Sequence, residues 1–205
     1  MKNIDLTFCF KGARQYIHGT DMLNQCTVLL REKLGAGLEQ LDFVIHRMTD
    51  RNLCLSLYPA ESVPDFDTLE VADLKFAVAG EYWDARLSDV DDGPDCRYPY
   101  DEDVVVHLCS LDAVGRQIVL QQEAPYSEIE TLVAMTKALH QKVFPDLDGS
   151  WVFCRWSSPR WPLVDSLKRV SIQLTQALGT RLTRSEVSLD GKVLGHIYFS
   201  ARSNK

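Results

Sequence analysis

Four residues that could bind an anionic substrate and move protons on it lie within eight positions near the start of the chain: Arg14, Tyr16, His18 and Asp21. A histidine titrates near neutral pH and can act as a general base, and a carboxylate within reach can orient it. Arginine and tyrosine can hold an anionic or carbonyl-bearing ligand. The pattern predicts His18 and Asp21 as catalytic residues and Arg14 and Tyr16 as ligand-binding residues. The alternative is a surface loop in which Asp21 only caps the following helix.

A second candidate is the segment WVFCRWSSPRW, residues 151–161, which holds three of the four tryptophans. Arginines that alternate with aromatic rings can stack on and clamp a planar or phosphorylated ligand. This predicts ligand contacts from Arg155, Trp156, Arg160 and Trp161. The same composition is typical of protein interfaces, and ordinary core packing of the tryptophans is the third interpretation.

The other histidines, His46, His107, His140 and His196, show neither the HxH nor the HxxxH spacing of metal ligands. The acidic run 89–95 lacks the glycine and glutamate positions of a calcium loop. Phosphate-binding, dinucleotide-binding and serine-hydrolase motifs are missing from the sequence. We therefore expect no metal and no cofactor.

The elements that must position these residues can be predicted from periodicity and from turn and capping signals. Alternation predicts strands, helical spacing predicts helices, and an acidic, turn-rich stretch at 84–102 predicts a loop or linker. The helix at 126–143 carries a Ser127–Glu130 capping box, and Gly35 is a natural end for the first helix. The predicted strands are 3–11, 41–48, 52–59, 73–80, 103–110, 115–122, 151–156, 184–189 and 192–200, and the predicted helices are 21–34, 126–143 and 165–178.

Two of the predicted helices resemble each other. Residues 21–38 and 165–182 share six of eighteen positions at one constant offset, including the leucine stripe and a glycine at the helix end. Two amphipathic helices can be alike for physical reasons alone, and an internal duplication is the other explanation. Duplication predicts a repeated unit of strand, loop, helix, strand and strand, with a first repeat at 1–83 and a second at 103–205.

That element order resembles the hot-dog fold of acyl-thioester dehydratases and thioesterases, over about residues 8–59 and 153–200. In that fold an antiparallel sheet wraps a long helix, and a catalytic histidine can lie in the loop before the helix. The corresponding loop here is YIHGTD, which contains His18, whereas the second copy has Leu163 at that place. The resemblance implies one catalytic site at most and an acyl-thioester substrate. The extra helix at 126–143 departs from the pattern.

Composition sets the wider limits. The chain has 205 residues, 45% of them apolar, and a formal net charge of −7, which is typical of a globular protein. The acidic balance disfavours nucleic acids and anionic membranes as partners. Six scattered cysteines without a C-x-x-C pair, together with the lack of a signal peptide or a long apolar span, predict free thiols and a cytoplasmic location.

We therefore predict an α+β fold, an antiparallel sheet packed by two or three helices and arranged as a double hot-dog. The predicted function is the binding or processing of a small anionic acyl-thioester-like substrate, free or carried on an acyl carrier, in a cleft between the repeats. The alternative is a non-catalytic accessory or immunity-type factor that binds another protein through the acidic 84–102 segment and the tryptophan-rich segment. Sequence leaves open whether the protein is an enzyme.

Overall fold

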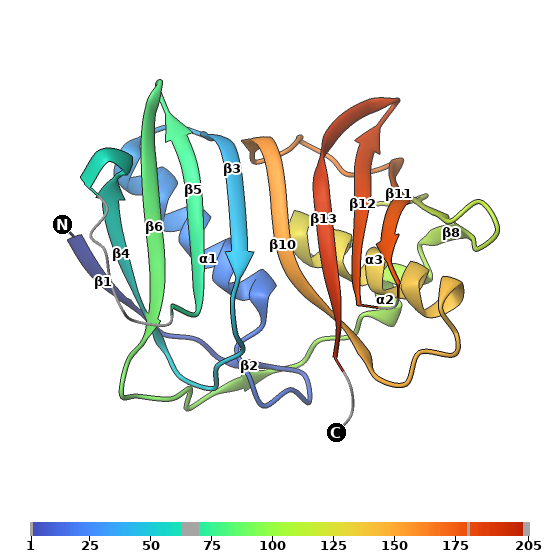
Figure 1. Ribbon diagram of the computed structural model, residues 1–205, viewed down its shortest axis with the longest axis horizontal. Helices are drawn as coiled ribbons and strands as arrows, with labels where there is room; N and C mark the ends of the chain where they lie inside the picture. Colours follow the sequence, from blue (N-terminus) through green and yellow to red (C-terminus); the bar gives the residue numbers. More distant parts are fainter. Residues whose placement is uncertain (1, 63–69, 180, 203–205) are drawn as a thin grey trace. The chain divides into compact units, whose positions relative to one another are not determined.

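The computed structural model describes residues 2–62, 70–179 and 181–202. The chain divides into two compact units. Unit 1 comprises residues 1–100 and 159–161, and unit 2 comprises residues 101–158 and 162–205. Each unit contains one long helix and its own antiparallel strands (Figure 1).

In unit 1, five strands form an antiparallel sheet in the order β1-β4-β6-β5-β3. Two short parallel strands, β2 and β7, form a separate ribbon beside the start of the long helix of this unit, α1. The elements are β1 (Lys2–Leu6), β2 (Phe10–Lys11), α1 (Gly19–Leu34), β3 (Leu38–Ile45), β4 (Leu53–Pro59), the 3₁₀ turn η1 (Ala60–Ser62), β5 (Ala72–Val78), β6 (Glu81–Asp89) and β7 (Arg97–Tyr98).

In unit 2, six strands follow the order β8-β9-β11-β12-β13-β10, again antiparallel. The elements are α2 (Asp103–Val106), β8 (Cys109–Asp112), β9 (Gln117–Leu120), α3 (Glu128–Val143), β10 (Ser150–Trp161), β11 (Val170–Leu178), β12 (Leu182–Leu189) and β13 (Lys192–Arg202).

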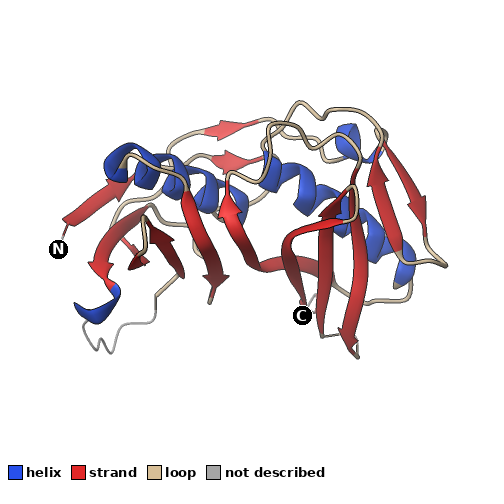
Figure 2. Cartoon of the chain, turned by 90° about the horizontal axis from the view of Figure 1, so that it is seen from above, coloured by secondary structure: helices blue, strands red, loops and turns tan. Residues whose placement is uncertain are grey.

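The two long helices form where their sequences predict them. In α1 the apolar positions Leu23, Cys26 and Leu30 recur on one face and are fully buried. The helix ends at Gly35, which has φ 71° and donates its N–H to the carbonyl of Arg31. Helix α3 buries a wider set of residues and begins with the predicted capping box. Each helix lies along one face of the sheet of its own unit (Figure 2).

The third predicted helix, at 165–178, is wrong. Residues 170–178 form strand β11, which pairs with β9 and β12. Val170, Ile172 and Leu174 are buried at every second position, as in a half-buried strand. The leucine spacing predicted a helix because residues four apart share one face in a helix and also in a strand. The apolar Ile172, two residues from Val170 and from Leu174, fits only the strand. The helix that corresponds to α1 in the second unit is therefore α3.

Three further expectations differ from the structure. Cys9 and Cys96 form a disulfide, with their Cα atoms 4.8 Å apart, so the expectation of six free thiols is wrong for this pair. Residues 84–89, expected in an acidic loop, belong to β6, whose Ala85 and Leu87 are buried in the sheet of unit 1. The strand expected at 103–110 is replaced by α2 and the start of β8. Among the described residues, no helix is long and apolar enough to cross a bilayer.

Candidate functional site

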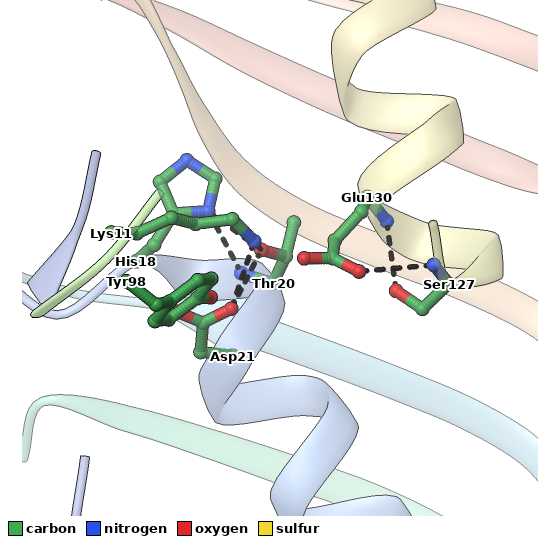
Figure 3. Close-up of polar contacts among 7 residues, drawn as sticks. All are labelled: Lys11, His18, Thr20, Asp21, Tyr98, Ser127 and Glu130. Carbon is green, nitrogen blue, oxygen red and sulfur yellow. Dashed lines mark hydrogen bonds and ion pairs between the residues drawn. The ribbon is translucent and has the colours of Figure 1, made fainter. Parts of the chain in front are cut away.

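Helix α1 begins at a histidine. His18 is the N-cap residue, with extended backbone angles of φ −77° and ψ 136°, and only 8% of it is exposed. Its Nδ1 accepts a hydrogen bond from the N–H of Thr20 and lies 2.7 Å from the Thr20 hydroxyl oxygen (Figure 3). A ring nitrogen that accepts a hydrogen bond carries no proton, so these contacts favour the neutral tautomer with its proton on Nε2. In Figure 3, Nε2 points away from Thr20 and from the helix.

A buried lysine reaches the same place from strand β2. Lys11 has no exposed surface. Its Nζ donates to the Thr20 hydroxyl at 3.0 Å and to Asp21 Oδ1 at 2.9 Å, and it lies 4.2 Å from the centre of the Tyr100 ring. The Thr20 hydroxyl has two acceptors within reach, Asp21 Oδ1 at 3.4 Å and His18 Nδ1 at 2.7 Å, and the contact with the imidazole is the shorter of the two. Lys11, Thr20 and His18 thus form a chain of hydrogen bonds that ends at the imidazole.

Asp21 is held from two sides. Its Oδ1 accepts from Lys11, and its Oδ2 accepts from the hydroxyl of Tyr98 at 2.8 Å, which comes from strand β7. The carboxylate compensates the buried ammonium, which would otherwise be costly to remove from water. The group that orients His18 is therefore Thr20, whereas Asp21 orients Lys11.

The remaining residues of the first predicted cluster lie close by. The Tyr16 ring stacks near the His18 ring, with the ring centres 6.3 Å apart. The Arg14 guanidinium lies over Tyr100, 5.7 Å from its centre. The structure thus brings together Arg14, Tyr16, His18 and Asp21.

Sequence reasoning missed Lys11, Thr20 and Tyr98 as members of this site. Lys11 ends an apolar run and Tyr98 lies within the expected acidic loop. No sequence signal links these two residues, because the parallel pairing of β2 with β7 joins segments far apart in the chain.

The tryptophan-rich segment is mostly a core strand. Trp156 is fully buried, and its Nε1 donates to the Ser158 hydroxyl at 3.1 Å. A Cβ at Gly195 would lie 2.8 Å from the Trp156 ring, so only glycine allows this packing. Trp151 and Trp161 are also buried. These rings therefore cannot form the exposed apolar patch that a protein-binding surface would need.

The arginines of this segment are more accessible. Arg155 is half-buried, with its guanidinium 5.2 Å from the centre of the Tyr198 ring, and Arg160 is exposed. Strand β10 extends beyond the strand predicted at 151–156 as far as Trp161, and the helix predicted at 165–178 is absent from this described part of the chain. The repeated order of strand, loop and helix predicted for this segment is therefore wrong.

Metal ligation has no support in the described ranges, where no group of three or more His, Cys, Asp or Glu side chains is placed to hold an ion. The charged groups of the α1 site are two cations, Lys11 and Arg14, and one carboxylate. The N-terminus of α1 adds the positive end of the helix dipole. Such a site suits a ligand that is anionic or develops negative charge.

No family profile matches the sequence, and no curated protein matches it. Similar solved structures do exist. The tesB protein of Mycobacterium avium subspecies paratuberculosis has a TM-score of 0.51 and 10% identity, covering 98% of this chain and 93% of that one. A candidate thioesterase from Novosphingobium aromaticivorans has a TM-score of 0.52 and 10% identity, covering 98% of this chain and 95% of that one.

The dehydratase domain of a mycocerosic acid synthase-like polyketide synthase has a TM-score of 0.51 and 14% identity, covering 92% of this chain and 83% of that domain. These proteins have the hot-dog fold, and at such low identity the likeness shows the fold alone. The chain is accordingly an α+β protein with the hot-dog fold in a double arrangement, as its sequence predicted.

Proposed function

We propose that the protein binds and processes a small anionic acyl thioester at the N-terminus of α1. The observation that carries the proposal is the buried hydrogen-bond chain from Lys11 through Thr20 to His18 Nδ1. With Nδ1 accepting the Thr20 N–H, Nε2 is the ring nitrogen that can donate to a ligand. The proposal is also supported by the thioesterases and the dehydratase domain that share the fold.

His18 would then act as a hydrogen-bond donor to the thioester carbonyl. Attack on a thioester, or removal of a proton next to it, moves negative charge onto the carbonyl oxygen. A donor that is already in place stabilises that charge without reorganising during the reaction. Sequence reasoning made His18 a general base; the Thr20 contacts favour the donor role in the resting state.

The positive groups have separate roles. Lys11 holds Thr20 and Asp21, so it is a positioning residue with respect to His18. Arg14 is half-buried beside Tyr100 and is the residue we assign to the anionic part of the substrate. Its charge-assisted hydrogen bonds would supply affinity and leave the chemistry to His18.

The test is turnover of a panel of short acyl-CoA and 3-hydroxyacyl-CoA thioesters, followed by mass spectrometry. This readout detects both release of the acyl chain and loss of water. His18→Ala should lower turnover by at least about a hundredfold, the low end of what one hydrogen-bond donor to a developing oxyanion contributes. The matched control is His46→Ala, because His46 lies in the same unit, is 42% exposed and pairs with Asp73 away from this site.

Two variants of Thr20 test whether this residue positions His18. Thr20→Val removes the hydroxyl that holds Nδ1, whereas Thr20→Ser keeps it. We expect Thr20→Val to lower kcat by about tenfold with little change in KM, and Thr20→Ser to restore kcat. Equal turnover by wild type and His18→Ala, or no turnover of any thioester by the wild type, would refute the proposed function.

A further inference from the structure

The disulfide lies beside the two strands that deliver residues to the site. Cys9 directly precedes β2 and Cys96 directly precedes β7, and the bond spans 87 positions of sequence. The strands pair in parallel, with Phe10 opposite Arg97 and Lys11 opposite Tyr98. The crosslink therefore fixes the register of the ribbon one residue before its first pair.

The second pair of the ribbon belongs to the site. Lys11 and Tyr98 both donate to the carboxylate of Asp21, at 2.9 and 2.8 Å. The Lys11 ammonium also donates to Thr20, which holds His18. A change in the ribbon would thus reach the imidazole through side chains in direct contact.

Apart from the crosslink and the side-chain bonds of Lys11 and Tyr98, the backbone pairing of the ribbon is short. Each strand has two residues, and two backbone hydrogen bonds flank the pair, from Phe10 N–H to the Cys96 carbonyl and from Gly12 N–H to the Tyr98 carbonyl, both 2.9 Å. Isolated two-stranded ribbons are marginally stable in water, and parallel pairing is slightly weaker than antiparallel pairing. Arg97 adds hydrogen bonds to the Gly12 and Arg14 carbonyls, but these are exposed to solvent.

The disulfide is also within reach of a reductant. Cys96 is exposed and Cys9 is half-buried, and both line an open hollow of about 390 Å³ with Asn52 and Asp92. The four free cysteines are less accessible: Cys26 is buried, and Cys54, Cys109 and Cys154 are half-buried, with thiol pKa values raised by burial. Cys96 is thus the exposed cysteine at which a reductant can attack.

We propose that the Cys9–Cys96 disulfide is a redox switch that holds Lys11 and Tyr98 on Asp21 when oxidised and releases the ribbon when reduced. A dithiol donor supplies the electrons: its thiolate attacks one sulfur to form a mixed disulfide, and its second thiol displaces the mixed disulfide. The donor becomes a disulfide, and Cys9 and Cys96 gain two electrons and two protons as thiols. The effect on turnover rests on the proposed function of the same site, whereas the effect on the ribbon does not.

Amide hydrogen exchange measured before and after treatment with dithiothreitol tests the switch. We expect the Phe10 and Gly12 amides, which donate the ribbon hydrogen bonds, to exchange at least about tenfold faster after reduction, because local opening sets exchange rates. The internal control is the Ile17 amide, bonded to the Thr49 carbonyl at 2.8 Å in the same unit, which should not change. The Cys9→Ser/Cys96→Ser variant should match the reduced protein with or without dithiothreitol, and Cys54→Ser should match the wild type.

Turnover is measured on the same samples. Reduction should lower thioester turnover of the wild type by about tenfold or more and leave that of the double serine variant unchanged. Equal exchange at Phe10 and Gly12 in the oxidised and reduced proteins would overturn the switch, as would failure of glutathione disulfide to oxidise the pair. Faster exchange on reduction in a protein that turns over no thioester would support the switch and refute the proposed function.

Discussion

The two long helices occupy corresponding places in the two units, yet they begin differently. Helix α3 starts with a standard capping box, in which the Ser127 hydroxyl accepts the Glu130 N–H and the Glu130 carboxylate accepts the Ser127 N–H at 3.0 Å. Helix α1 starts at His18, which is not among the preferred N-cap residues. One start has the residues that stabilise a helix, and the other has an imidazole that can donate a hydrogen bond to a ligand.

The acidic residues next to these two N-caps differ in the groups that they bind. In unit 2 the Glu128 carboxylate accepts backbone N–H groups of Leu163 and Val164, at 3.1 and 3.2 Å, and so fixes a loop. In unit 1 the Asp21 carboxylate accepts from two side chains, Lys11 and Tyr98. A buried charge pair is costly to remove from water. This difference is a reason to place the proposed chemistry in unit 1.

The sheets differ as well. In unit 2, β11, β12 and β13 follow one another as neighbouring strands. In unit 1, β6 lies between β4 and β5, so the chain passes from β4 to the far side of β6 before it returns by a tight hairpin. Both sheets remain antiparallel, so the same packing surface for a helix is built from two different connections.

The largest expected effect concerns the buried pair of unit 1. Asp21→Ala leaves the Lys11 ammonium buried without its carboxylate, so we expect the free energy of unfolding to fall by about 3–5 kcal/mol. Urea unfolding measures this. Lys11→Met combined with Asp21→Ala removes the buried charge and should recover part of the loss. A single variant as stable as wild type would mean that the ammonium is not desolvated as the structure has it.

Leu30 in α1 and Leu174 in β11 are both buried, although one lies on a helix and the other on a strand. Truncation of either to Ala should cost about 2–5 kcal/mol, because each leaves a cavity in a packed core. Leu178→Ala is the matched control, since Leu178 ends the same strand and is 69% exposed, and it should cost less than about 0.5 kcal/mol. A similar loss for Leu178→Ala would contradict the strand assignment at 170–178.

His140 on α3 is a histidine packed in the core, in contrast to His18 at the start of α1. It is fully buried among Phe144, Trp151 and Phe199, and burial lowers its pKa from the usual 6.5 to about 4. Because the unfolded state binds the proton more tightly, the stability from neutral His140 is complete above about pH 6.5 and is lost as the pH falls toward 4. At about 1.4 kcal/mol for each pH unit, the loss is about 3 kcal/mol.

The measurement is urea unfolding at several pH values between 7 and 4. His140→Phe suits the aromatic surroundings and should remove this part of the pH dependence, whereas His46→Ala, at an exposed histidine, should keep it. An unchanged pH dependence in His140→Phe would assign the acid sensitivity to other groups.

Sequence predicted the α+β class, the hot-dog fold and both long helices, whereas the roles predicted for the residues around His18 stay predictions. Those elements carry strong local signals: the apolar stripe of α1 with Gly35, and the capping box of α3. The strand β11 was missed because its leucine spacing fits two periods. Lys11 and Tyr98 were missed because their meeting depends on long-range pairing of β2 with β7, and no local pattern encodes such a pairing.

The smallest expected change in stability concerns the two N-cap residues, Ser127 and His18, and tests whether His18 does more than cap its helix. Ser127→Ala removes a hydroxyl cap from α3 and should cost about 1 kcal/mol. His18→Ser exchanges one N-cap acceptor for a better one at the start of α1, so stability should change by less than about 0.5 kcal/mol. The serine cannot place a hydrogen-bond donor where Nε2 lies, so thioester turnover should still fall at least about a hundredfold. Thermal unfolding and turnover measured on one preparation of each variant check both statements. Should His18→Ser keep full turnover, His18 would be a cap like Ser127, and the difference between the two helix starts would have no chemical meaning.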